Sequence, residues 1–323
     1  MFDLAEFLPP AQAGTSLWPL MRQAGITHAV GQFYGPDQLL EGEKPWDFLP
    51  LLRLKHQYED SGFSLDIIED RPPMNLTKRG LPGRDDEIAA VKTLLENMGR
   101  LGIGIWCYQW MADFTWLRTS TAIPSRGGSL VSGFDAAALV DAPGTEYGPL
   151  REDDAWSALE YFLAAVLPTA EQWGVKLAMH PDDPPLSVLR GVARIMSSVP
   201  AFERLVELVP SPMNGITLCQ GNFRLMTDDL PATIRTLGQK VFFVHLRDVA
   251  GTKTKFVETW HDAGPTDLFE CMQTYREVGF SGLIRPDHVP TLYGEPNAMP
   301  GYGTLGRLFA AGYLRGLQQA VYR

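Results

Sequence analysis

Val175-Lys-Leu-Ala-Met-His180 is a short apolar, strand-like run that ends in a residue able to bind a divalent metal. Three further runs in the second half of the chain end in the same way. They are Gly215-Ile-Thr-Leu-Cys219, Val241-Phe-Phe-Val-His245 and Leu283-Ile-Arg-Pro-Asp287. In a parallel α/β barrel the carboxyl ends of the strands meet at one face, where the active site lies. The sequence therefore predicts that these four terminal residues converge on one ion.

Eight strand-like runs alternate with longer helical patterns, as expected for a parallel sheet covered by helices. The predicted strands are Phe2–Leu8, Thr27–Phe33, Phe63–Glu69, Gly104–Gln109, Val175–His180, Gly215–Cys219, Val241–Leu246 and Gly282–Asp287. Eight is the number of strands that closes a TIM (β/α)8 barrel, and 323 residues suit one barrel with loop insertions on its catalytic face. The sequence therefore predicts one domain over residues 1–323.

Apolar residues at helical spacing lie between many of these strands. The predicted helices are Asp85–Arg100, Asp153–Trp173, Ser187–Ser197, Leu268–Val278 and Gly306–Tyr322. An excursion at about 112–150, rich in Ser, Thr, Gly and Pro, interrupts the alternation after the fourth strand. We expect it on the catalytic face, as a lid or as a homo-oligomer contact such as a dimer interface. A shorter excursion, Pro72–Arg84, is expected on the same face.

The composition argues against several classes of partner. Lys and Arg number 28 against 38 Asp and Glu, a net charge of −10, and no long basic run suits a nucleic-acid backbone. The three cysteines, Cys107, Cys219 and Cys271, are sparse and odd in number, which is typical of a reduced, cytoplasmic protein. We expect no secretory signal and no membrane partner, because no apolar stretch approaches the roughly 18 residues that a span requires.

The four strand-end residues offer nitrogen, sulfur and oxygen ligands, a mixed set that suits Zn, Fe(II), Mn(II) or Co(II). A single histidine at a strand end is more often a hydrogen-bonded structural residue, but four such residues at four successive strand ends favour a metal site. The loop His180-Pro-Asp-Asp-Pro-Pro185 places two acids after the first ligand and stiffens the backbone with prolines. The acids are expected to orient the histidine or to bind substrate hydroxyls; an ordinary proline-rich turn is the alternative.

Several motifs occur together and in a fixed order. They are Lys78-Arg-Gly-Leu-Pro-Gly-Arg-Asp85, Cys107-Tyr-Gln-Trp-Met111, Trp116-Leu-Arg-Thr119, His180-Pro-Asp-Asp-Pro-Pro185, Asn214-Gly-Ile-Thr-Leu-Cys219, Val244-His-Leu-Arg247, Ile284-Arg-Pro-Asp-His288 and Pro300-Gly-Tyr-Gly303. From about residue 60 to 315 the chain resembles the mannonate dehydratase family of hexuronate catabolism. The resemblance implies a xylose-isomerase-like TIM barrel, a divalent metal (Mn2+ or Fe2+), and loss of water from D-mannonate to give 2-keto-3-deoxy-D-gluconate.

The resemblance also implies roles for individual residues. It assigns the metal ligands to His180, Cys219, His245 and Asp287, and the acid–base pair to His288 and Tyr302. One of that pair takes the C2 proton of the substrate and the other protonates the departing C3 hydroxyl; the sequence leaves open which does which. As alternatives, His288 orients another group and Tyr302 is a packing aromatic between two glycines.

Four polar residues are predicted to contact a small anionic sugar acid. They are Arg247, Asn222, Arg84 and Arg118. Arg247 follows a metal ligand by two residues, and its planar guanidinium suits a carboxylate; a surface arginine is the alternative.

The chain departs from the family pattern beside the last ligand. Val289-Pro290 follows His288 where the family usually has Gly-Arg, and Gln220-Gly-Asn222 follows Cys219 where it tends to have Thr-Gly-Ser. The metal site matches but the substrate contacts differ, so the exact sugar acid stays open. Two other functions also remain: a metal-dependent isomerase or epimerase of sugars or sugar acids, which shares the first proton abstraction, and a non-catalytic sugar-acid-binding barrel.

Overall fold

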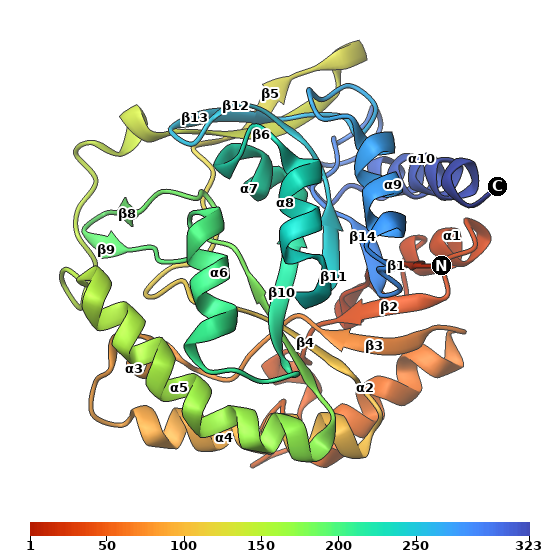
Figure 1. Ribbon diagram of the computed structural model, residues 1–323. Helices are drawn as coiled ribbons and strands as arrows, with labels where there is room; N and C mark the ends of the chain where they lie inside the picture. Colours follow the sequence, from red (N-terminus) through yellow and green to blue (C-terminus); the bar gives the residue numbers. More distant parts are fainter.

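Eight parallel strands close into a barrel in the computed structural model, which describes all 323 residues (Figure 1). Around the barrel they lie in the order β1 (Asp3–Phe7), β14 (Leu283–Pro286), β11 (Val241–Leu246), β10 (Asn214–Cys219), β7 (Lys176–His180), β4 (Ile105–Gln109), β3 (Ser64–Ile68) and β2 (His28–Gly31). The last of these pairs back with the first. Each predicted strand coincides with one of the eight, so the predicted barrel is confirmed.

Alternation along each strand decides which side chains face the barrel interior. On β11, Phe243 belongs to a small apolar cluster with residues of the other barrel strands, whereas Val244 packs in the large core shared with the helices. His245 lies two residues beyond Phe243 and therefore projects inward at the carboxyl end. On β7, Ala178 and His180 repeat this relationship. The period of two thus points the predicted ligands into the barrel mouth.

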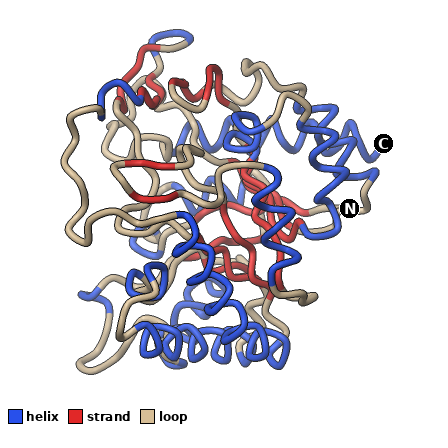
Figure 2. The backbone as a smooth tube through the Cα atoms, turned by 60° about the vertical axis from the view of Figure 1, so that its left-hand side comes forward, coloured by secondary structure: helices blue, strands red, loops and turns tan.

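Helices cover the outside of the barrel (Figure 2). They are α1 (Leu17–Gln23), α2 (Phe48–Asp60), α3 (Asn75–Arg79), α4 (Arg84–Arg100), α5 (Glu152–Trp173), α6 (Val199–Leu208), α7 (Gln220–Met226), α8 (Leu230–Leu237), α9 (Leu268–Glu277) and α10 (Thr304–Tyr322). Four of the five predicted helices correspond to α4, α5, α9 and α10. None of the helices combines the length and the apolar character that crossing a bilayer requires.

The fifth predicted helix, Ser187–Ser197, is wrong. This segment contains a hairpin made of β8 (Val188–Leu189) and β9 (Val192–Ala193). Arg190 and Gly191 turn the chain between them with φ values of 52° and 79°, which no right-handed helix contains. The apolar spacing of the segment comes from strand residues on either side of this turn.

The excursion at about 112–150 contributes half of a second sheet. Its strands β5 (Ser120–Pro124) and β6 (Leu130–Asp135) join β12 (Val249–Thr252) and β13 (Lys255–Glu258), which follow β11. This four-stranded antiparallel sheet lies at the carboxyl end of the barrel, at the top of Figure 1. Two loop segments more than a hundred residues apart thus build one cover over the predicted catalytic face. The predicted oligomer contact stays a prediction.

Candidate metal centre and active site

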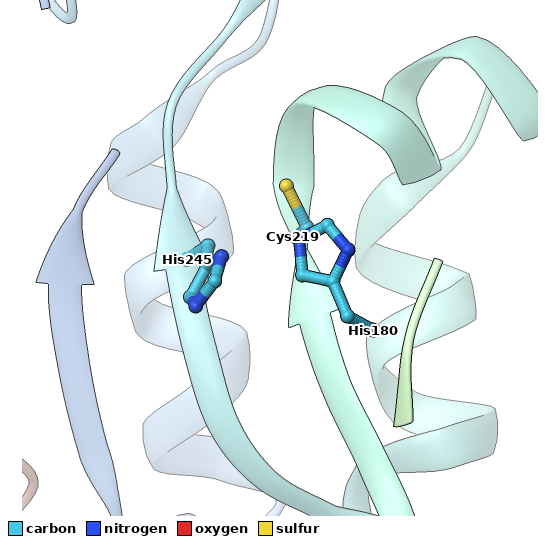
Figure 3. Close-up of side chains that lie close together, drawn as sticks. All are labelled: His180, Cys219 and His245. Carbon is cyan, nitrogen blue, oxygen red and sulfur yellow. The ribbon is translucent and has the colours of Figure 1, made fainter. Parts of the chain in front are cut away.

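Three of the four predicted metal-binding side chains lie together at the ends of adjacent strands. One ligand atom from each of His180, Cys219 and His245 lies within 4.8 Å of the other two, and Figure 3 shows the side chains next to one another. The fourth residue, Asp287, directly follows β14. Its Oδ2 lies 3.7 Å from Sγ of Cys219 and 3.9 Å from Nδ1 of His245. The fold therefore gathers all four side chains at one side of the barrel mouth.

The surroundings of the two histidines fit a bound cation. Nδ1 of His180 lies 2.7 Å from the carbonyl oxygen of Pro181, so it carries the proton and Nε2 keeps its lone pair. Burial lowers the pKa of His180, which favours this neutral ring. Nε2 of His245 is buried without a hydrogen bond, although Oε2 of Glu69 lies 3.3 Å away. Because buried polar atoms are usually partnered, this nitrogen beside an imidazole and a thiol fits a divalent ion.

A buried network of two arginines and two carboxylates lies next to the ligands. Arg118 pairs with Asp183 at 2.5 Å and with Glu258 at 2.6 Å. Arg247 pairs with the same two residues at 2.8 and 3.0 Å, and all four side chains are at most 3% exposed. Burial alone would raise the pKa of Glu258, but Arg247 and Arg118 outweigh it and lower that pKa to about 2. The same two arginines lower the pKa of Asp183 against the effect of its burial, so both carboxylates stay ionised at neutral pH.

The network engages three of the four predicted substrate contacts with partners inside the protein. Arg247 also donates to Oδ2 of Asp287 at 2.9 Å and to Oδ1 of Asn222 at 2.6 Å, so its Nε, Nη1 and Nη2 all have protein partners. Neither Arg247 nor Asn222 nor Arg118 borders the cavity at the barrel mouth. Arg84 begins α4, stacks 3.7 Å from the centre of an aromatic ring of α5, and lies outside that cavity too. None of these four side chains borders that cavity, and their contact with a substrate stays a prediction.

His288 and Tyr302 lie edge to face, with ring centres 5.4 Å apart. Nδ1 of His288 lies 2.9 Å from Oε1 of Glu258, and a proton held in that hydrogen bond leaves Nε2 as an acceptor. The hydroxyl of Tyr302 donates to Oδ1 of Asp287 at 3.5 Å. The pair thus offers one proton acceptor and one proton donor beside the predicted metal ligands.

The residues after His288 explain how this pair is held. His288 has φ of 26°, a left-handed value that a non-glycine residue seldom takes and that is common at functional sites. The next residue, Val289, donates its N–H to the carbonyl of Gly301 at 2.8 Å, which brings the loop before α10 against β14. The backbone of Pro290 lies against α10, because a Cβ on Gly306 would come within 2.2 Å of the Pro290 carbonyl oxygen, and neither Val289 nor Pro290 borders the cavity. The Val289-Pro290 segment therefore shapes the site without bordering the cavity.

One cavity of about 500 Å3 unites these groups. Of the predicted catalytic and metal-binding residues, those that border it are His180, His245, Asp287, His288 and Tyr302. Cys219 is fully buried beneath its wall. The volume is in the range of small-molecule sites, so a six-carbon acid can be enclosed.

Several further charged or polar residues border the cavity and were not predicted as site residues. They include Glu69, Gln109 and Arg285. Arg285 pairs with Glu69 at 2.9 Å and with Asp287 at 2.8 Å. Burial raises the pKa of Glu69, but Arg285 and then His245 outweigh it and lower that pKa to about 2. Glu69 and Gln109 end two predicted strands, as the metal-binding side chains do, so their position at a strand end is the sequence signal that marks them.

Comparisons with known proteins agree with this geometry. A family model described as D-mannonate dehydratase matches residues 17–146 and 144–323. Mannonate dehydratase 1 of Bacillus licheniformis is 35% identical over 312 residues, covering 86% of this chain and 85% of its own length. The mannonate dehydratase of Enterococcus faecalis is 34% identical over 332 residues, with 92% and 91% coverage.

Solved structures give the same result for the fold. The crystal structure of mannonate dehydratase from Streptococcus suis serotype 2 has a TM-score of 0.91 at 31% identity, covering 100% of this chain and 95% of that one. A structure of L-ribulose 3-epimerase, at 14% identity and a TM-score of 0.63, covers 100% of this chain and 96% of that one. The second likeness shows the barrel architecture alone.

Proposed function

We propose that this chain, which belongs to the D-mannonate dehydratase family, is a hydro-lyase that removes water from D-mannonate or a related aldonate to give 2-keto-3-deoxy-D-gluconate. The observation that carries the proposal is the pairing of His288 and Tyr302 beside a cluster of metal-type donors in one cavity. Dehydration next to a carboxylate needs a base, an acid and a positive charge. Each has a candidate in this cavity.

The positive charge is the part that a divalent ion would provide. Residues His180, Cys219, His245 and Asp287 would hold Mn2+ or Fe2+, which suit a set of nitrogen, sulfur and oxygen donors. When bound, such an ion acts as a Lewis acid beside the oxygen atoms of the substrate.

The protein side chains perform the proton transfers. Glu258 holds Nδ1 of His288, so Nε2 is positioned to accept the C2 proton of the acid. Tyr302 presents an O–H group, so it is positioned to protonate the C3 hydroxyl as that group leaves. The order of events follows from the substrate, since breaking the C2–H bond creates the electron pair that expels the C3 oxygen as water. We therefore assign His288 as the base and Tyr302 as the acid.

The test is a product assay with the purified protein. Incubated with Mn2+ or Fe2+ and D-mannonate, the protein is expected to produce a 2-keto-3-deoxy acid, and His288→Asn is expected to abolish the product while substrate binding persists. Mannonate epimerised at C2 or C3 without water loss would support an isomerase or epimerase instead. Absence of any conversion, with the acid still raising the melting temperature, would leave a binding protein and refute the proposal.

A further inference from the structure

Arg71 borders the active-site cavity with a guanidinium that has no partner. None of its side-chain nitrogens makes a hydrogen bond or an ion pair within the protein, whereas Arg285, the other arginine of the cavity wall, holds two carboxylates. Burial lowers the pKa of Arg71, and only the charge of Asp70 opposes this effect. Asp70 itself is occupied, since it accepts the backbone N–H groups of Phe33 at 3.1 Å and of Arg71 at 2.8 Å. A half-buried guanidinium that borders the cavity and has no protein partner is available to an anionic ligand.

Gln109 provides a second unused donor on the same wall. Its Oε1 accepts hydrogen bonds from Nζ of Lys78, at 3.1 Å, and from the backbone N–H of Met111. Two donors on one oxygen fix the orientation of the amide, so Nε2 is the free end. That nitrogen is buried and has no partner, on a side chain that is only 9% exposed. A donor held in this way is ready for an acceptor from a ligand.

The barrel order places both groups away from the reacting atoms. The predicted metal ligands end or follow four consecutive strands, β7, β10, β11 and β14, and His288 follows the last of these. Gln109 ends β4, and Arg71 follows β3 by three residues. The carboxylate of an aldonate is attached to C2, so it must stay with the carbons that react beside His288. Its C5–C6 end then extends toward the β3–β4 side.

We propose that Arg71 and Gln109 bind a second anionic group at the end of the sugar acid remote from the reacting carbons. The inference rests on the proposed dehydratase function and specifies its substrate class, a dianionic acid. Two sources offer the same chemistry: the terminal carboxylate of an aldaric acid and the terminal phosphate of a phosphorylated aldonate. A planar guanidinium binds either through two parallel hydrogen bonds, and the amide of Gln109 adds a third donor.

A neighbouring cavity leaves room for a terminal group that extends beyond C6 of the sugar acid. It measures about 480 Å3 and shares Asp70, Arg71, Met111 and Thr115 with the main cavity. Arg71 therefore lies at the junction of the two spaces. A terminal group that reaches this junction meets a cation, whereas the uncharged C6 hydroxyl of D-mannonate would leave that cation unpaired.

The experiment compares three acids with two variants of the metal-reconstituted enzyme. The acids are D-mannonate, D-mannarate and D-mannonate 6-phosphate; the variants are Arg71→Gln and the charge-retaining Arg71→Lys. We expect the wild type to prefer one dianionic acid over D-mannonate by roughly 10- to 100-fold in kcat/KM, the value of a charge-assisted hydrogen bond. Arg71→Gln should remove the preference through KM, and Arg71→Lys should restore part of it. The better dianion identifies the terminal group as carboxylate or phosphate.

Controls separate the possible failures. Arg235→Gln, which removes an exposed arginine of α8 paired with Glu277, should leave all three rates unchanged. Since Arg71 has no protein partner, its substitution should not lower the melting temperature. If the wild type dehydrates D-mannonate without preferring a dianion, or if Arg71→Gln impairs D-mannonate equally, the inference is overturned while the proposed function stands. If no acid loses water, the proposed function fails, and calorimetric binding of D-mannarate then tests the Arg71 site by itself. Weaker binding to Arg71→Gln than to wild type supports the site, and equal binding overturns it.

Discussion

Replacing Arg247 with methionine is expected to reduce stability rather than substrate affinity. Its guanidinium holds Asp183, Glu258 and Asp287 at 2.8 to 3.0 Å, and the side chain is 1% exposed. Each carboxylate retains another cation in the variant, but the buried cluster loses one positive charge. Breaking a buried ion pair by removing one partner costs about 3–5 kcal/mol. A chain of 323 residues unfolds with an entropy of roughly 0.7 kcal/mol/K, so the melting temperature should fall by about 4–7 °C.

The assay is thermal unfolding of metal-loaded wild type and variant, with KM for the acid measured in parallel. Arg247→Met should change KM by less than about threefold, because the guanidinium does not border the cavity. Arg235→Met, at an exposed pair with Glu277, is the matched control and should cost at most about 1 kcal/mol. A variant with an unchanged melting temperature and a KM raised tenfold or more would show that Arg247 binds the substrate, and would refute this reasoning.

Three further predictions follow from the same site. The pKa of Glu258 is about 2 in the folded protein against an ordinary 4.5. Its ionised form therefore contributes about 3 kcal/mol to the free energy of unfolding above pH 4.5, and this stability is lost as the pH falls toward 2. Thermal unfolding between pH 7 and pH 3 should show a smaller loss of stability in Glu258→Gln than in wild type. Chelation with EDTA should abolish dehydration and Mn2+ or Fe2+ should restore it, whereas Cys219→Ser should need more metal for the same activity, as metal titration will show. Tyr302→Phe should lower kcat by about 10²–10⁴ with little change in KM, which steady-state kinetics will test.

The barrel was predictable because each of its strands is a short apolar run bounded by turn residues. Val241–Leu246 illustrates this, since the run is buried on both faces and its period of two points His245 inward. The local signal for the helix α6 was also present. Ser198 accepts a hydrogen bond from the backbone of Ala201, and Pro200 lies in the first turn. The helix was predicted about ten residues too early because apolar spacing was given more weight than these start signals.

The cover sheet and the buried charge network were not predictable from local sequence. β6 pairs with β13, a strand about 120 residues later, and no local pattern encodes that pairing. Arg118 and Glu258 meet only because this pairing brings their segments together. A sequence shows that an arginine is present but not whether the fold has already neutralised it. For this reason three of the four residues predicted to contact the substrate are hydrogen-bonded within the protein, and Arg71 was not among the predicted residues.

The distribution of charge in the site determines what the cavity can recognise. Three arginines beside the cavity are already paired with carboxylates of the protein. They are Arg118, Arg247 and Arg285, and their charges keep Glu69 and Glu258 ionised at neutral pH. These pairs consume the positive charge of the arginines that hold them. The segment after His288 adds no cation either, because Pro290 stands where the family pattern has arginine and its backbone lies against Gly306 of α10. The only arginine of the cavity wall left to attract an anion is Arg71, so the charge at the far end of the acid is the property by which we expect this enzyme to select its substrate.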